Sequence, residues 1–294
     1  MTDLGESGNI ATAREFFEYV KAHPKGTCHP SREDIPRVLV TGFGLFQGIR
    51  YNPTGSLVEM LHDPKFPDVE AKNVVLEDSD HGGKIRSRYF EINGRSIELC
   101  LAILDVKWDL AGAILAYEMR HFRPHLVLML GRGGQAFEME GGALNKATGS
   151  PGYGSDGKPL PEINKPKSEW ILKDVPVGQE IKMTWEHLKW GPKLKPLAQE
   201  LGFELKIHKE ARPDNNYICN NLSLVAARAA SGHALSLAGG KIVLKESKRF
   251  EAPQVGFLHF PAIDSKVEEP KNATAQILGF SEMVLSFVQF SLGL

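Results

Sequence analysis

Short, almost wholly apolar runs alternate along this chain with longer stretches in which apolar positions recur every three or four residues. The short runs are rich in Val, Leu and Phe, and several end at Gly or Pro, which is typical of strands buried on both faces of a parallel sheet. The strands predicted in this way are 37–41, 72–77, 125–130, 204–207 and 254–260, with a hairpin formed by 89–93 and 96–101 around Gly94.

The longer stretches have the spacing of amphipathic helices. Pro53 suits the first turn of one of them, and Pro124 ends another. The predicted helices are 12–22, 53–61, 109–122, 188–201, 217–231 and 273–290. Because strands and helices alternate, the pattern predicts an α/β fold, a three-layer α/β/α sandwich with a mainly parallel mixed sheet.

The chain of 294 residues divides into two parts by its pattern. Residues 1–35 form an N-terminal extension, and residues 36–294 form a single α/β domain. Within that domain, residues 146–180 are rich in Gly, Pro, Lys and Ser and predict a long surface excursion.

Composition excludes several classes of function. Charged residues make up 24% of the chain and the net charge is −1, so no basic excess favours nucleic acid. No uninterrupted apolar run has the length of a membrane span, and the N-terminus lacks the features of a signal peptide. Cys28, Cys100 and Cys219 have no metal-ligand spacing and are odd in number, so neither a disulfide framework nor a zinc site is predicted. We expect a cytoplasmic protein without a metal or other cofactor.

Cys219 is the first candidate for chemistry. It lies in the sequence Tyr-Ile-Cys-Asn, in the first turn of the helix predicted at 217–231. Unpaired N–H groups and the positive end of the helix dipole favour a thiolate at that position. Free cysteines are more often small buried apolar residues, so position alone leaves both interpretations open.

His259 and Glu140 are the other two candidates. His259 stands near the end of a predicted strand, between Leu258 and Phe260, where a base or a hydrogen-bonded core histidine would both fit. Glu140 follows the strand 125–130, and it shares a face with Glu138 if that segment is extended. A carboxylate there would orient an imidazole, whereas the alternative is a solvated loop side chain.

The glycine loop after the first strand, Thr-Gly-Phe-Gly-Leu-Phe-Gln-Gly at 41–48, raises a different possibility. A dinucleotide-binding oxidoreductase would have GxGxxG directly before a helix, but the spacing here is GxGxxxG and the next helix begins only at Pro53. The two phenylalanines, Phe43 and Phe46, fit the wall of a pocket for a small apolar ligand better.

Four of these segments together resemble pyroglutamyl peptidase I, the pyrrolidone-carboxylate peptidase family of cysteine peptidases. The segments are the loop Thr-Gly-Phe-Gly-Leu-Phe-Gln-Gly-Ile-Arg-Tyr-Asn-Pro-Thr at 41–54, Glu-Gly-Gly-Ala-Leu-Asn at 140–145, Tyr-Ile-Cys-Asn at 217–220 and Gly-Phe-Leu-His-Phe-Pro at 256–261. They occur in the family's order, and the resemblance extends from about residue 37 to the end.

The resemblance implies a phosphorylase/hydrolase-like fold and removal of an N-terminal pyroglutamyl residue from a small peptide. It implies a catalytic triad of Cys219 as nucleophile, His259 as base and Glu140 as the group that orients the base. The implied substrate-binding residues are Phe43, Phe46, Asn52 and Gln135. It also suggests a homodimer or homotetramer, whereas the charge and the lack of a long apolar run predict that no nucleic acid or membrane is a partner.

Other segments depart from the family's pattern. Asp214 and Asn215 stand where the family often has Ala-Gly, and the region 146–150 lacks the arginine that bacterial members place near the oxyanion. The N-terminal extension and the stretches 146–180 and 232–254 are longer than in compact members. The alternative is therefore an altered member that acts on another small N-acyl or amide substrate, or only binds it.

Overall fold

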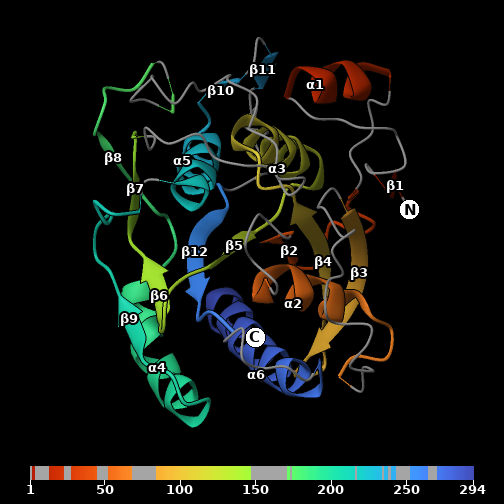
Figure 1. Cartoon of the computed structure of the whole chain (residues 1–294). Helices are drawn as coiled ribbons and strands as arrows, with labels where there is room; N and C mark the ends of the chain where they lie inside the picture. Colours follow the sequence, from red (N-terminus) through yellow and green to blue (C-terminus); the bar gives the residue numbers. More distant parts are fainter. Residues whose placement is uncertain are drawn as a thin grey trace.

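An eight-stranded mixed sheet forms the centre of the computed structural model (Figure 1), with the strand order β1-β3-β4-β2-β5-β12-β6-β9. The inner strands β4, β2, β5 and β12 are parallel, and β3 and β6 run antiparallel to their inner neighbours. The bounds are β1 Thr2–Asp3, β2 Arg37–Phe43, β3 Lys84–Ile92, β4 Arg95–Leu104, β5 Leu126–Arg132, β6 Phe137–Glu140, β9 Leu205–Ile207 and β12 Gln254–Phe260.

Helices cover both faces of this sheet. Helices α3 and α5 pack together on one face with α1 against α3, whereas α2, α4 and α6 occupy the other face. The bounds are α1 Ala13–Ala22, α2 Pro53–His62, α3 Trp108–Phe122, α4 His187–Glu200, α5 Ile218–Ala230 and α6 Pro270–Leu292. The expected three-layer α/β/α architecture is confirmed.

The structure describes residues 2–3, 13–22, 28–44, 52–67, 84–146, 171–172, 174–215, 217–233, 235–237, 240–242, 252–263 and 270–294. Two small antiparallel sheets complete this part of the chain. They pair β7 Gly142–Leu144 with β8 Glu180–Lys182, and β10 Leu235–Leu237 with β11 Gly240–Ile242. The predicted strand 72–77 and most of the excursion 146–180 lie outside the described residues.

The elements that the apolar pattern predicted best are those with strong local signals. The hairpin of β3 and β4 turns at Asn93 and Gly94, which both have positive φ, as a two-residue hairpin loop requires.

Strands β6 and β7 were not predicted, because the Gly-rich sequence around Glu138 and Glu140 lacks a β-branched apolar run.

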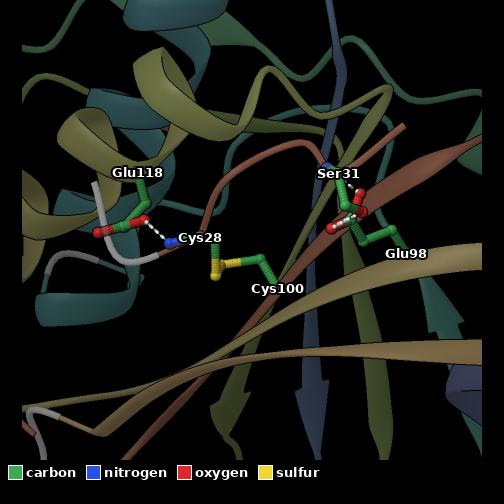
Figure 2. Close-up of a disulfide and its surroundings, with 5 residues drawn as sticks. All are labelled: Cys28, Ser31, Glu98, Cys100 and Glu118. Atoms are coloured by element: carbon green, nitrogen blue, oxygen red, sulfur yellow. Dashed lines mark hydrogen bonds between the residues drawn. A yellow bond between two sulfur atoms is a disulfide. The ribbon is translucent and has the colours of Figure 1, made fainter. Parts of the chain in front are cut away.

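A buried disulfide between Cys28 and Cys100 corrects the expectation that no cysteine pair forms (Figure 2). The backbone N–H of Cys28 also donates to Glu118 of α3, and the Ser31 hydroxyl donates to Glu98 of β4. The two cysteines are 72 positions apart, so only tertiary structure brings them together. Closing a loop of that length stabilises the fold by about 4 kcal/mol in the chain-entropy description.

This disulfide joins the segment before residue 36 to the sheet, and Phe16 of α1 is buried against Tyr117 of α3. Residues before the proposed boundary are thus packed onto the domain, although the division at residue 35 itself stays a prediction. Because disulfides persist mainly in oxidising environments, the cysteines give no support to a cytoplasmic location.

Helix α6 is the one helix in the described part of the chain that is long and apolar enough, by length and composition, to cross a membrane. Its inward side includes Phe280, Met283 and Phe287, which are buried in the core. Phe280 contacts Phe260 of β12 and Phe137 of β6. This packing is that of a core helix, and it supports the strands that hold the site described next.

Candidate active site

Three elements meet where strand β5 ends at the carboxyl edge of the sheet. In the strand register His259 of β12 lies beside Gly131 of β5, and it lies opposite Glu138 of β6. Phe257 lies opposite Glu140 in the same antiparallel pair. Because alternate residues of a strand share a face, His259, Glu138 and Glu140 all point to the face that α5 covers.

Cys219 is the second residue of α5 and is half-buried, with a free thiol. The chain enters this helix through Tyr217, whose ring packs edge-on against Trp108 of α3. A Cβ atom added to Gly131 would lie 2.8 Å from the Cys219 sulfur. The thiol therefore sits over Gly131, directly beside the strand position of His259.

His259 is 4% exposed, and its Nδ1 atom lies 2.9 Å from Oε1 of Glu140. Nδ1 makes no hydrogen bond of standard geometry in the described structure, so this is a close ion-pair contact. Burial lowers the pKa of His259. The charge of Cys219 and a hydrogen bond with that side chain outweigh this, and with Glu140 they raise the pKa to about 9. The imidazole is therefore charged at neutral pH.

Glu140 is fully buried, which tends to raise the pKa of its carboxyl. The close contact and charge of His259, and then those of Arg212, outweigh burial and hold that pKa below its usual value. The backbone carbonyl of Glu140 accepts a hydrogen bond of 2.9 Å from the indole of Trp185. The carboxylate is thus fixed in place and ionised. It is not the solvated loop side chain of the alternative interpretation.

Arg212 was not identified from the sequence, although it is the second cation beside Glu140, after His259. Its Nε donates to Oε1 of Glu140 at 2.9 Å, and its Nη1 lies 2.9 Å from Oε2 of Glu138. It lies in an irregular polar segment between β9 and α5, where no local sequence pattern marks it as a functional residue. Only the burial of Glu140 would have signalled the need for a cationic partner.

Glu138, Glu140 and His259 offer ligand atoms within 4.8 Å of one another, a spacing compatible with a metal ion. Arg212 already pairs with both carboxylates, so a divalent cation would have to displace its guanidinium group. The cluster is better described as a network of ion pairs.

The four expected substrate-binding residues have different surroundings. Phe43 is buried at the end of β2. Thr41 pairs with Met129 of β5, so Phe43, two positions further on, is level with Gly131. Phe46 lies outside the described residues. Asn52 is buried and caps α2, accepting from the Thr54 N–H and donating to the Gly44 carbonyl. Gln135 is exposed between β5 and β6.

The Asn52 side chain thus uses both its oxygen and its nitrogen inside the protein. It thereby joins Gly44, which directly follows β2, to the first turn of α2. The helix that follows begins at Pro53, as expected.

Gly131→Ala is expected to slow alkylation of Cys219 by iodoacetamide at least about tenfold, which corresponds to about 1.4 kcal/mol. The added methyl group would overlap the thiol sulfur and the Phe257 ring, which lies 2.6 Å from it. Labelling followed by mass spectrometry measures the rate at this one cysteine. Gly134→Ala is the matched control, since its Cβ would meet nothing within 4 Å. Equal rates in the two variants would refute the close packing of thiol and strand.

The fold matches solved structures of pyrrolidone carboxyl peptidase from the hyperthermophile Pyrococcus furiosus. One, of the enzyme and its Cys-free mutant, has 18% sequence identity, a TM-score of 0.56, and covers 87% of this chain and 98% of its own. Another, of a mutant of the same enzyme, has 17% identity, a TM-score of 0.56 and the same coverage. No family model and no curated protein sequence matches the chain. At this identity the similarity shows the fold alone.

Proposed function

We propose that this chain is a cysteine hydrolase that removes N-terminal pyroglutamyl groups from peptides. The observation that supports the proposal is the convergence of Cys219, His259 and Glu140 at one edge of the sheet. These residues come from three separate segments, and they converge in a fold shared with pyrrolidone carboxyl peptidases. A nucleophile, a base and a group that orients the base form the minimal set for acyl transfer.

In the proposed mechanism, His259 takes the proton of the Cys219 thiol, or already holds it in an ion pair with the thiolate. The thiolate attacks the carbonyl carbon of the pyroglutamyl residue and forms a tetrahedral intermediate. The imidazolium then gives its proton to the leaving amine, and the thioester remains. His259, now neutral, removes a proton from water, which attacks the thioester and releases pyroglutamate. Glu140 holds the ring in position and stabilises its charged form in both halves of the reaction.

No cofactor enters this scheme, since each proton and electron pair moves between the substrate, water and the three side chains. The proposed substrate is a small peptide with a neutral lactam at its N-terminus. Phe43 and Phe46 are proposed to contact the lactam ring, with Gln135 at the rim. Assembly into dimers or tetramers and a cytoplasmic location remain expectations.

Wild-type enzyme is expected to release a fluorophore from a pyroglutamyl amide at least about 100-fold faster, as kcat/KM, than from the matching prolyl amide. The two substrates differ in that proline has a charged ring nitrogen, which an aromatic pocket would have to desolvate. Fluorescence assays with both amides measure the ratio. Comparable rates on the two amides would contradict the proposed specificity.

The alternative is a site that binds pyroglutamate without turnover, or that acts on a different small N-acyl amide. The observation that favours it is the engagement of Asn52 within the protein, which leaves fewer polar groups for a substrate. A rise in melting temperature with pyroglutamate, combined with no release of fluorophore, would establish the binding-only alternative.

A further inference from the structure

We propose that Arg212 is a positioning residue, which holds the Glu140 carboxylate in the orientation that aligns and charges His259. The inference rests on the proposed function for its kinetic consequences. Its structural part concerns only the geometry of Arg212, Glu140 and His259.

Arg212 contacts the same carboxylate oxygen that faces the imidazole. Its Nε and Nη2 atoms lie 2.9 and 2.8 Å from Oε1 of Glu140, and Nδ1 of His259 lies 2.9 Å from that oxygen. The other oxygen, Oε2, is buried without a hydrogen-bond partner in the described structure. Arg212 and His259 are therefore the polar partners that the described structure gives this carboxylate, and without Arg212 the oxygen that faces the ring loses one of the two groups that orient it.

Arg212 is itself held from several sides. Its Nη1 lies 2.9 Å from Oε2 of Glu138 and 3.5 Å from Oδ2 of Asp214. The side chain is 20% exposed, compared with 78% for Asp214, so the contacts with the two glutamates are the shielded ones. A planar guanidinium group with donors on two edges serves two carboxylates at once, which a lysine ammonium does less well.

The same arginine also lies seven positions before Cys219, in the segment that leads into α5. Its backbone carbonyl accepts from the Asn215 N–H, and the preceding Ala211 N–H donates to Glu180 of β8. These two hydrogen bonds hold the segment between β9 and α5 at the position where Arg212 contacts β6.

The test compares Arg212→Met and Arg212→Lys with wild type. For Arg212→Met we expect kcat on a pyroglutamyl amide to fall about 10- to 100-fold with little change in KM, since the change acts on alignment and not on substrate contacts. Arg212→Lys should recover part of the loss.

The acid limb of the kcat profile supplies a readout that a purely structural role would not move. The charged groups around Glu140 in the described structure are His259, Arg212 and Glu138, and Arg212 is one of the two that lower its pKa. When the guanidinium is removed, the Glu140 carboxyl should take up a proton at higher pH. The acid limb should therefore shift upward in both variants, and further in Arg212→Met.

Lys206→Met is the matched control. Lys206 lies 4.0 Å from the same Glu138 but has no contact with Glu140, and it is 46% exposed. Its kcat and acid limb should stay within about twofold and 0.2 pH units of wild type. If Arg212→Met behaves like this control, the positioning role is wrong. If Arg212→Met does not fold, the acid limb of Arg212→Lys decides in the same way.

Alkylation of Cys219 separates this inference from the proposed function. The rate of labelling by iodoacetamide as a function of pH needs no substrate, and its acid limb should shift in Arg212→Met as the kinetic one does. A wild type without peptidase activity but with this shift would refute the proposed substrate and leave the positioning role intact. An unchanged labelling profile would overturn the positioning role even in an active enzyme.

Discussion

Cys219→Ala is expected to lower kcat on a pyroglutamyl amide by at least about 10⁴-fold, close to the limit of detection. Such a loss corresponds to about 5.4 kcal/mol of transition-state stabilisation. The reason is that Cys219 is the free cysteine of the described structure, and the two remaining cysteines are joined in a disulfide. A continuous fluorescence assay at high enzyme concentration measures the residual rate.

The variant should keep the fold, because Cys219 is only half-buried and the disulfide of Cys28 and Cys100 is untouched. Circular dichroism and a melting temperature within a few degrees of wild type would establish that the loss is chemical. Pyroglutamate should still stabilise the variant against heat. Turnover by Cys219→Ala at the wild-type rate would remove Cys219 from the mechanism.

His259→Asn is expected to lower kcat/KM by about 10³- to 10⁴-fold, and the wild-type rate should decline as the pH rises past about 9. The pKa of His259 is raised to about 9, so the imidazolium that protonates the leaving amine persists below that pH and disappears above it. The measurement is kcat/KM between about pH 5 and pH 10.5 with a stable buffer series.

The raised pKa of His259 also determines how the stability of the fold changes with pH. Because the folded pKa of His259 exceeds the ordinary value of 6.5, its charged interactions stabilise the fold fully below pH 6.5. They are lost as the pH rises through about 9.

His62→Asn is the control for His259→Asn. Burial lowers the pKa of His62, and this residue lies on α2, at the opposite face of the sheet. An alkaline limb that stays at the same pH in Glu140→Gln would contradict the pairing of Glu140 with His259, because losing that carboxylate should lower the limb.

The strand and helix pattern of the core could be predicted from local sequence. The buried runs that became β2, β5 and β12 have no periodicity to confuse with a surface helix, and their order with the helices indicates a parallel sheet. Strand β6 could not be predicted in this way, because the alternation of Glu138 and Glu140 with apolar residues covers only four positions in a glycine-rich segment. Its pairing with β12 is a long-range contact.

The residues with chemical potential were also visible in the sequence, each with an ordinary structural alternative. The position of Cys219 in the first turn of α5 follows from helix periodicity, and His259 falls on β12 as the apolar run predicts. By contrast, nothing in the sequence around Arg212 marks it as the partner of a buried carboxylate. Its role depends on the pairing of β9 with β6, since the segment that follows β9 brings Arg212 to Glu140.

Local sequence patterns are enough to specify the α/β class and the main strands and helices. They also mark the three side chains proposed for catalysis as candidates. Which of those side chains meet, that Cys28 pairs with Cys100, and that Arg212 joins the cluster all depend on the assembled sheet. The disulfide and the pair of Arg212 with Glu140 each join positions 72 residues apart. Such contacts are set by sheet order and strand register, which no local pattern encodes.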